Sequence, residues 1–403
     1  MLFFRASTDG TATDATAALE NLYAGNDPTA CWLVGSGPSI LGAPVEQIAA
    51  SPVVKIGVNF SGRGPDGTAP RITPDIWTSF DPTSRFHRSI FLNPRITKFL
   101  KADKQKDLIP GTTFKACDCP ATYFFRSETR GYGDFLDSRS DRILNALDSF
   151  IQALDIGYRL GFRRFFCVGA DFIIRPSDAQ VSLAVSCGID FDETSGVLVT
   201  KDADPKLHYR SDRLVDFVDE CIRKFGGKDR RAVIEELESA GREQQYSFSE
   251  TKPLAAAIHA DSHYWERVQY LRLARRNLSL RGVSLVSCSP GSRLNDWFSF
   301  REPLTVCDEM TAACGDPREE RTVGRYSGDV RDAVRESLPH HRDVSPYDWA
   351  QTVSRRAKSD LDSAPTVVAE AANPVPAVAA DRIQAAVNRF KGINNPVEIE
   401  EVL

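Results

Sequence analysis

The sequence of 403 residues lacks an excess of basic side chains, because 50 Lys and Arg stand against 55 Asp and Glu, for a formal net charge of −5. Binding of nucleic acid without regard to base sequence needs a basic surface, so we expect no nucleic-acid partner. The sequence also lacks any apolar run near the roughly 20 residues that span a bilayer. Its first residues, MLFF, are followed by polar ones, so we expect neither a membrane span nor a signal peptide.

Cysteine pairs at metal-binding spacing are scarce as well. The nine cysteines are odd in number and lack the spacing of a small disulfide framework, which favours a reduced, cytoplasmic protein. Cys117 and Cys119 in ACDCP form the one close pair. No second pair at matching spacing accompanies them, so we predict ordinary semi-buried cysteines and no structural metal site.

Short apolar runs bounded by Gly, Pro, Asn or Asp are present, and they predict strands. The runs lie at 31–34, 53–58, 76–80, 89–92 and 165–168, with another before the Ser-Pro-Gly turn at 289–291. Apolar residues at helical spacing predict helices over 143–160 and from 262 to a stop at Gly282. Alternation of helices and strands predicts an α/β fold with an open, doubly wound, mostly parallel Rossmann-like sheet.

Composition divides the chain into two parts. Residues 1–316 are predicted to form one nucleotide-binding transferase domain, in which 172–260, with a looser pattern, is an inserted lid-like segment. Residues 317–403 include the Ala/Pro/Val-rich stretch SAPTVVAEAANPVPAVAA and a short amphipathic helix in DRIQAAVNRFKGI. We expect a flexible tail, which either docks onto a protein partner through that helix or has no binding role.

The first predicted strand runs into a glycine-rich turn in CWLVGSGPSI. Gly35 and Gly37 permit close backbone approach to a ligand, and Pro38 is favoured at the first helical position. Free N–H groups at a helix start favour phosphate. The turn is neither a GxGxxG motif nor a P-loop, since no Gly-Lys-Ser/Thr follows. Taken alone, it is equally consistent with a structural turn and with a phosphate site.

Polar residues follow three further predicted strands. Asn59 follows the second, Asp81 the third and Asp171 the strand at 165–168. Each could serve as a helix cap or turn residue. Because carboxyl ends of parallel strands share one edge of a sheet, they could also converge on a ligand. An Asn side chain can bond a base or ribose, and carboxylates suit sugar hydroxyls or magnesium.

The ordered set GSGPSI, VNF, SFDPTSRF, SFIQALDIGYRLGFRRFFCVGADF, SHY and VSLVSCSPGSRLNDWF resembles the small bacterial sialyltransferases that use CMP-sialic acid. It is also similar to a related Rossmann-like superfamily that includes archaeal-type hydroxymethylpterin diphosphokinases. The resemblance covers 31–172 and 263–298. It implies nucleotide binding by the first turn, by Asn59 and by Ser149 at the start of the long helix. With Asp81 added from the strand ends, the expected nucleotide-binding set is Gly35, Ser36, Gly37, Pro38, Ser39, Asn59, Asp81 and Ser149.

The chain departs from that family at three positions. Phe150 stands where the family has glycine, Ile173 where it has a phosphate-binding tyrosine, and Arg267 where it has a catalytic histidine. A guanidinium is always protonated and cannot be a general base, but it suits a phosphate. His263 is then the candidate for acid–base chemistry, against the alternative of a histidine that packs at a helix start. The expected catalytic set is His263, Asp171 and Arg267.

These observations favour a nucleotide-dependent transferase, a glycosyltransferase of the sialyltransferase-like kind that acts on a nucleotide-sugar donor and an unidentified acceptor. One alternative is a diphosphokinase that uses ATP, with magnesium held by Asp81 or Asp171. Another is a catalytically silent nucleotide-binding or assembly protein. The expected cofactor is a nucleotide or nucleotide-sugar, with magnesium as a candidate.

Overall fold

The computed structural model describes residues 1–25, 29–59, 72–145, 147–192, 197–200, 209–225, 229–241 and 243–314. The predicted tail at 317–403 lies outside these residues. No helix within the described ranges is both long and apolar enough to cross a membrane.

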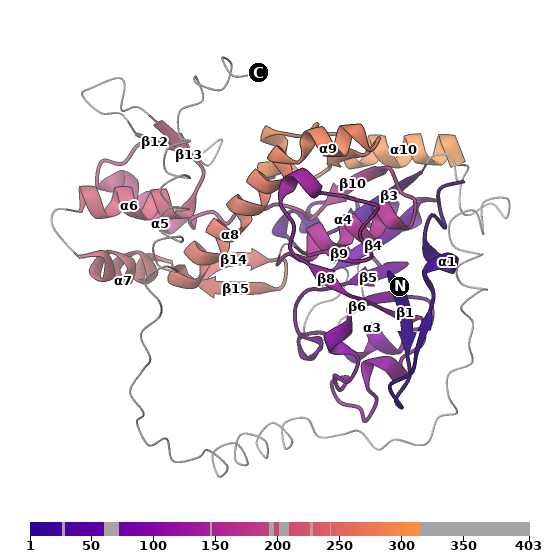
Figure 1. Ribbon diagram of the computed structural model, residues 1–403. Coiled ribbons are helices and arrows are strands. Elements are labelled where there is room, and N and C mark those ends of the chain that lie inside the picture. The colour runs from indigo at the N-terminus through magenta and orange to yellow at the C-terminus, as the bar shows by residue number, and fades with distance from the viewer. Residues whose placement is uncertain are drawn as a thin grey trace, which may run out of the picture. The chain divides into compact units, whose positions relative to one another are not determined.

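A sheet of nine strands forms the centre of the described fold, in the order β16-β10-β3-β4-β5-β6-β7-β1-β2 (Figure 1). The seven strands from β16 to β7 are parallel, and β1 and β2 extend the sheet antiparallel beyond β7. The predicted α/β class with a mostly parallel sheet is therefore confirmed. The strands, in sheet order, are β16 (Ser284–Ser287), β10 (Arg164–Val168), β3 (Ala30–Val34), β4 (Val54–Val58), β5 (Ile76–Thr78), β6 (Thr97–Lys101), β7 (Thr122–Phe125), β1 (Phe3–Ala6) and β2 (Ala12–Asp14).

The chain changes direction in the sheet between β3 and β10. From β3 it proceeds outward through β4, β5, β6 and β7, and it then returns to place β10 on the other side of β3. All five residues of β3 and all five of β4 are buried, as expected for central strands covered on both faces. In open α/β sheets, ligands bind beyond the carboxyl ends of the strands at such a reversal.

Helices cover the sheet and carry most of the remaining core. Helix α4 packs on β3, β4 and β5, and helix α10 packs on α2. The prediction of a helix over 143–160 is confirmed in part, because the first two residues form a short strand and Asp148 begins the helix as its N-cap. The helices and short strands around the sheet are α1 (Thr16–Leu19), α2 (Val45–Ala50), α3 (Arg88–Leu92), α4 (Ser149–Arg159), α9 (Arg275–Leu280), α10 (Pro303–Cys314), β8 (Ser127–Glu128) and β9 (Ile143–Leu144).

One predicted strand is wrong. Residues 89–92 belong to helix α3, which buries Ile90 and Phe91 on one side and is capped by the His87 side chain. An apolar run of four residues fits either a strand or a buried helical turn. Here the His87 side chain accepts the Ser89 N–H and so stabilises the start of a helix. The strand expected there is β6, which follows at Thr97–Lys101.

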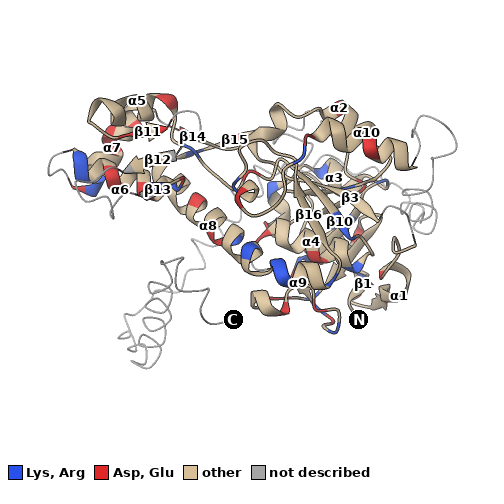
Figure 2. Cartoon of the chain, turned by 90° about the horizontal axis from the view of Figure 1, so that it is seen from above, with Lys and Arg blue, Asp and Glu red and all other residues tan. Residues whose placement is uncertain are grey.

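The segment at 172–260 builds a second hydrophobic cluster, separate from the core of the sheet. Helix α8 (Leu254–Leu273) contacts α6 and α7 of this segment and also η5 (Tyr132–Asp134) and η7 (Arg293–Asp296) beside the sheet. Figure 2 shows that both acidic and basic residues lie along α6 and α8. The elements of the segment are α5 (Asp178–Ser186), α6 (Leu214–Lys224), α7 (Arg230–Ala240), a sheet of β11 (Phe191–Asp192), β12 (Val197–Thr200) and β13 (Tyr209–Ser211), and the hairpin of β14 (Glu243–Ser247) and β15 (Glu250–Pro253).

Candidate functional site

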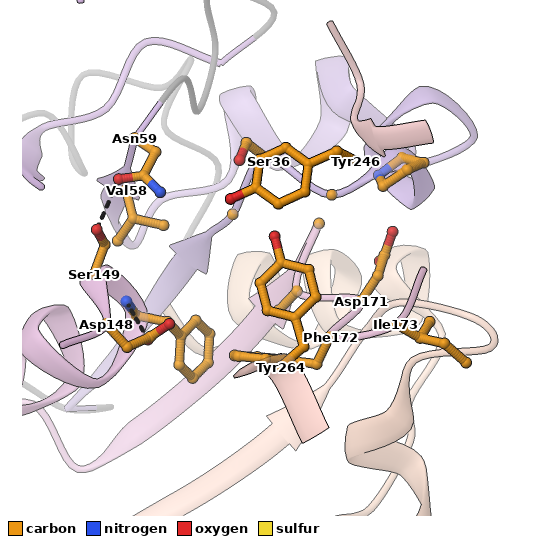
Figure 3. Close-up of a pocket in the computed structure, with 16 residues that line it drawn as sticks. Ser36, Val58, Asn59, Asp148, Ser149, Asp171, Phe172, Ile173, Tyr246 and Tyr264 are labelled. Carbon is orange, nitrogen blue, oxygen red and sulfur yellow. Dashed lines mark hydrogen bonds between the residues drawn. The ribbon is translucent and has the colours of Figure 1, made fainter. Parts of the chain in front are cut away.

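A pocket lies at the carboxyl ends of β3, β4 and β10, where the chain changes direction in the sheet (Figure 3). Four of the predicted residues from separate parts of the sequence meet there: Ser36, Asn59, Ser149 and Asp171. The full lining is Gly35, Ser36, Gly37, Pro38, Val58, Asn59, Asp148, Ser149, Phe150, Gly169, Ala170, Asp171, Phe172, Ile173, Tyr246 and Tyr264.

Asn59 is held in one orientation by two serine hydroxyls. Its Oδ1 accepts hydrogen bonds from Ser79 Oγ and Ser149 Oγ, each at 2.7 Å. Ser149 Oγ itself accepts the Phe80 N–H at 2.9 Å, and Ser79 Oγ accepts the Asp81 N–H at 3.1 Å. Both hydroxyl protons are therefore free for donation to Asn59, whose amide oxygen is the acceptor of both bonds. Its Nδ2 group points into the pocket (Figure 3).

The backbone of Asn59 is also constrained. Its φ of 53° is left-handed, a conformation that asparagine adopts more readily than most residues. Its carbonyl accepts a hydrogen bond from Trp77 Nε1 at 2.8 Å. Ser149, predicted to bind nucleotide directly, lines the pocket but uses its hydroxyl to position Asn59.

The glycines of the first turn have a structural explanation. A Cβ on Gly35 would lie 2.2 Å from the carbonyl oxygen of Gly169, and one on Gly37 would lie 2.7 Å from Asp171 Oδ2. The Gly37 N–H donates to that same carbonyl of Gly169 at 2.8 Å. Glycine is required here because the loop after β10 packs closely against the loop after β3. Both glycines also line the pocket, so their role toward a ligand stays a prediction.

Asp171 occupies the position in which we expected a phosphate. Pro38 begins the short helix η1 (Pro38–Leu41), and Asp171 Oδ2 accepts the Ser39 N–H at 2.8 Å while its Oδ1 accepts from Ser39 Oγ. Burial raises the pKa of Asp171, and the bonds from Ser39 oppose that rise. Because the carboxylate already satisfies the helix start, the turn offers a phosphate fewer amides than we expected.

An aromatic wall, which the sequence did not predict, faces Asn59 across the pocket. The rings of Tyr246 and Tyr264 are stacked with centroids 5.8 Å apart and planes 4° apart. Phe172 meets Tyr264 edge-on at 5.8 Å and Phe150 at 5.0 Å. Burial raises the pKa of both Tyr246 and Tyr264, so both hydroxyls remain protonated near neutral pH. The Tyr264 hydroxyl hydrogen-bonds to that of Tyr246, which leaves the Tyr246 proton available to a ligand.

Asp148 is a second lining residue that the sequence analysis missed. Its Oδ1 caps α4 by accepting the N–H groups of Phe150 at 2.8 Å and Ile151 at 3.0 Å. Its Oδ2 lies 3.8 Å from Nε2 of His263, whose side chain is 32% exposed. His263 is thus placed beside the pocket through Asp148, although it does not line the pocket itself. An Asp before an amphipathic helix is a recognisable N-cap signal, so Asp148 could have been identified.

Two predicted residues lie elsewhere. Arg267 is not part of the pocket lining and pairs with Glu266 at 3.3 Å. Asp81 pairs with Arg85 at 2.7 Å and is also outside the lining. Among the described residues that line the pocket, carboxylates are present at Asp148 and Asp171, and there is no lysine, arginine or histidine. The expectation that Arg267 binds phosphate in this pocket is therefore corrected.

The described part of the chain contains no group of three or more His, Cys, Asp or Glu side chains placed to hold a metal ion. Comparison with protein-family models, curated proteins and solved structures found no match to this chain.

Proposed function

We propose that the chain is a nucleotide-dependent transferase of the glycosyltransferase type, built on a Rossmann-like sheet, which binds a nucleotide-sugar donor in the pocket at the ends of β3, β4 and β10. The observation that carries this proposal is the fixed orientation of Asn59, whose Oδ1 is used by Ser79 and Ser149. An amide held in this way presents its N–H donors to the pocket, and the pocket lies where open α/β sheets bind ligands.

The other lining groups fit an uncharged or singly charged polar ligand. Ser36 Oγ and the Tyr246 hydroxyl can donate hydrogen bonds to phosphate or sugar oxygens. The tyrosine rings give an apolar surface for a base or sugar face. A single phosphodiester, as in a nucleoside-monophosphate sugar, needs less positive charge than a triphosphate. The described lining supplies no lysine or arginine, so it supports a glycosyl donor better than the ATP of a diphosphokinase.

Transfer would proceed by attack of an acceptor hydroxyl oxygen on the anomeric carbon of the donor. The bond from that carbon to the phosphate oxygen breaks, and its electron pair leaves with the phosphate, which the hydroxyl and amide donors of the pocket stabilise. The acceptor proton passes to the carboxylate of Asp148, beside which the imidazole of His263 lies at 3.8 Å. His263 then removes the proton toward solvent, which gives the imidazole the acid–base role predicted for it.

Thermal unfolding with CMP, UDP, GDP and ATP, each with and without magnesium, tests the proposal. A ligand at a hundredfold excess over its dissociation constant stabilises the folded state by about 2.7 kcal/mol. We expect stabilisation by CMP, which carries a single phosphate, and weaker stabilisation by the diphosphate UDP. Stabilisation by ATP with magnesium alone would favour the diphosphokinase. Stabilisation by none of the four would contradict the proposal and favour an assembly protein.

A further inference from the structure

The β14–β15 hairpin belongs to the inserted segment, yet it reaches the pocket. Tyr246 on β14 lines the pocket and stacks on Tyr264 (Figure 3). At the turn of the hairpin, the Phe248 N–H donates to the carbonyl of Ser36 at 2.9 Å. One wall of the pocket is therefore supplied by a hairpin whose two strands pair only with each other among the described strands.

A bridge of charged side chains fastens the same turn to the sheet domain. Arg85 ends the short helix η2 (Thr83–Arg85), which follows β5. Its Nη1 lies 2.7 Å from Asp81 Oδ2, and its Nη2 donates to Oε1 and Oε2 of Glu250 at 2.9 and 3.0 Å. The three side chains are 35%, 28% and 25% exposed. Asp81 thus takes part in holding the hairpin, and the sequence analysis had assigned it to the nucleotide.

We propose that the β14–β15 hairpin is a gate on the pocket and that Arg85, held by Asp81 and linked to Glu250, is the latch that keeps the gate closed. The inference rests on the proposed function for the identity of the ligand, but the gate itself can be tested without one. Partly exposed ion pairs are individually weak and are screened by salt. A latch of this kind therefore favours the closed hairpin while leaving it able to open on the time scale of ligand exchange.

The stacked tyrosines give the gate its connection to the site. Tyr246 moves with the hairpin, whereas Tyr264 belongs to α8 and packs edge-on against Phe172 beside β10. Lys252 on β15 lies over the Tyr246 ring at 3.9 Å from its centroid. Opening the hairpin would separate the two tyrosines and break the hydrogen bond from the Phe248 N–H to the Ser36 carbonyl. The same movement would therefore remove one wall of the pocket and expose its interior.

Thiol labelling at the pocket wall measures this opening directly. A Ser36→Cys variant keeps the backbone carbonyl that accepts the hydrogen bond from Phe248. Mass spectrometry then follows the rate at which a maleimide labels the new thiol at position 36. Labelling of the exposed Cys187 in the same sample is the internal reference. We expect Glu250→Gln and Arg85→Gln, each added to Ser36→Cys, to raise the labelling rate about two- to fivefold. Salt at about 0.5 M should raise it similarly when the latch is intact.

The matched control is Arg231→Gln, which removes the exposed pair between Arg231 and Glu235 on α7 and should leave the labelling rate unchanged. Equal labelling rates in the latch variants, the control and high salt would overturn the gate. An increase equal in the control and in the latch variants would overturn it too, because it would report general loosening. If CMP binds, it should slow labelling at position 36. If CMP does not bind to the protein that retains Ser36, the proposed function fails, and the labelling rates still test the gate.

Discussion

Replacement of Asn59 by Asp separates the ligand-binding role of this side chain from its role in the fold. Aspartate has the same shape, tolerates the left-handed φ of 53°, and can accept both serine hydroxyl bonds that Asn59 Oδ1 accepts. Two things change: an oxygen replaces the Nδ2 that points into the pocket, and the side chain becomes a negatively charged carboxylate. An acceptor then faces the acceptor atoms of the ligand.

The expected loss follows from the hydrogen bonds involved. Loss of a hydrogen bond to a charged ligand group inside a pocket reduces the binding free energy by about 1.5–3 kcal/mol. The dissociation constant for CMP should therefore be about 10- to 150-fold higher. The free energy of unfolding should change by less than about 1 kcal/mol, because the two serine bonds remain. Asn59→Ala is the contrasting variant: it loses both bonds and places alanine at a left-handed position, so it should lose about 2–4 kcal/mol.

Calorimetric titration with CMP and unfolding in urea measure the two quantities. The reasoning is refuted if Asn59→Asp binds CMP within about threefold of the unmodified protein. It is refuted in a second way if Asn59→Asp is as unstable as Asn59→Ala, because the amide orientation derived from Ser79 and Ser149 would then be wrong.

Three further predictions concern catalysis, pH and the scaffold. Asp148→Asn keeps an N-cap residue but removes the carboxylate, so kcat for transfer from the donor should fall about 10²–10⁴-fold. The control is the equivalent N-cap substitution Asp229→Asn on α7, which should leave kcat unchanged. Burial lowers the pKa of Lys98 to about 7, so between about pH 7 and 8.5 the unfolded chain binds a proton that the folded chain lacks. The free energy of unfolding should therefore rise with pH by up to about 1.4 kcal/mol per pH unit relative to that of Lys98→Met. Urea unfolding at pH 7 and 8 measures this difference, and the same pH dependence in both proteins would contradict it. Arg293→Met removes a cation that is only 2% exposed and pairs with the fully buried Asp261 at 3.1 Å. The free energy of unfolding should fall by about 3–5 kcal/mol. A fall of less than about 1 kcal/mol would show that this ion pair does not stabilise the fold.

The central strands could be predicted because burial on both faces produces uninterrupted apolar runs. Strands β3 and β5 correspond to such runs, β10 does so after Arg164, and β4 does so apart from Lys55. Strand β6 was missed because its sequence, TKFLK, carries lysines. The first of them, Lys98, is fully buried and donates from Nζ to the Asn93 carbonyl at 2.9 Å. A buried lysine that satisfies itself on the backbone gives no apolar signal, so hydrophobic pattern alone could not show this strand.

The pocket could be predicted only on the side formed by strand ends. Asn59 and Ser36 follow adjacent parallel strands, and the common edge of such strands brings them together. Tyr246 lies on a hairpin and Tyr264 on a helix beyond the insertion. No local sequence pattern predicts that these two elements contact the carboxyl ends of the strands. The close contact between Gly35 and Gly169 could not be predicted either, because it depends on two loops that meet only in the folded chain.

A crystal structure of the protein grown with CMP tests the central claim most directly. We predict that the nucleotide lies between Asn59 and the stacked tyrosines, with Asn59 Nδ2 within hydrogen-bond distance of a base or phosphate acceptor. An empty pocket at millimolar CMP, or a nucleotide bound elsewhere on the protein, would contradict the account.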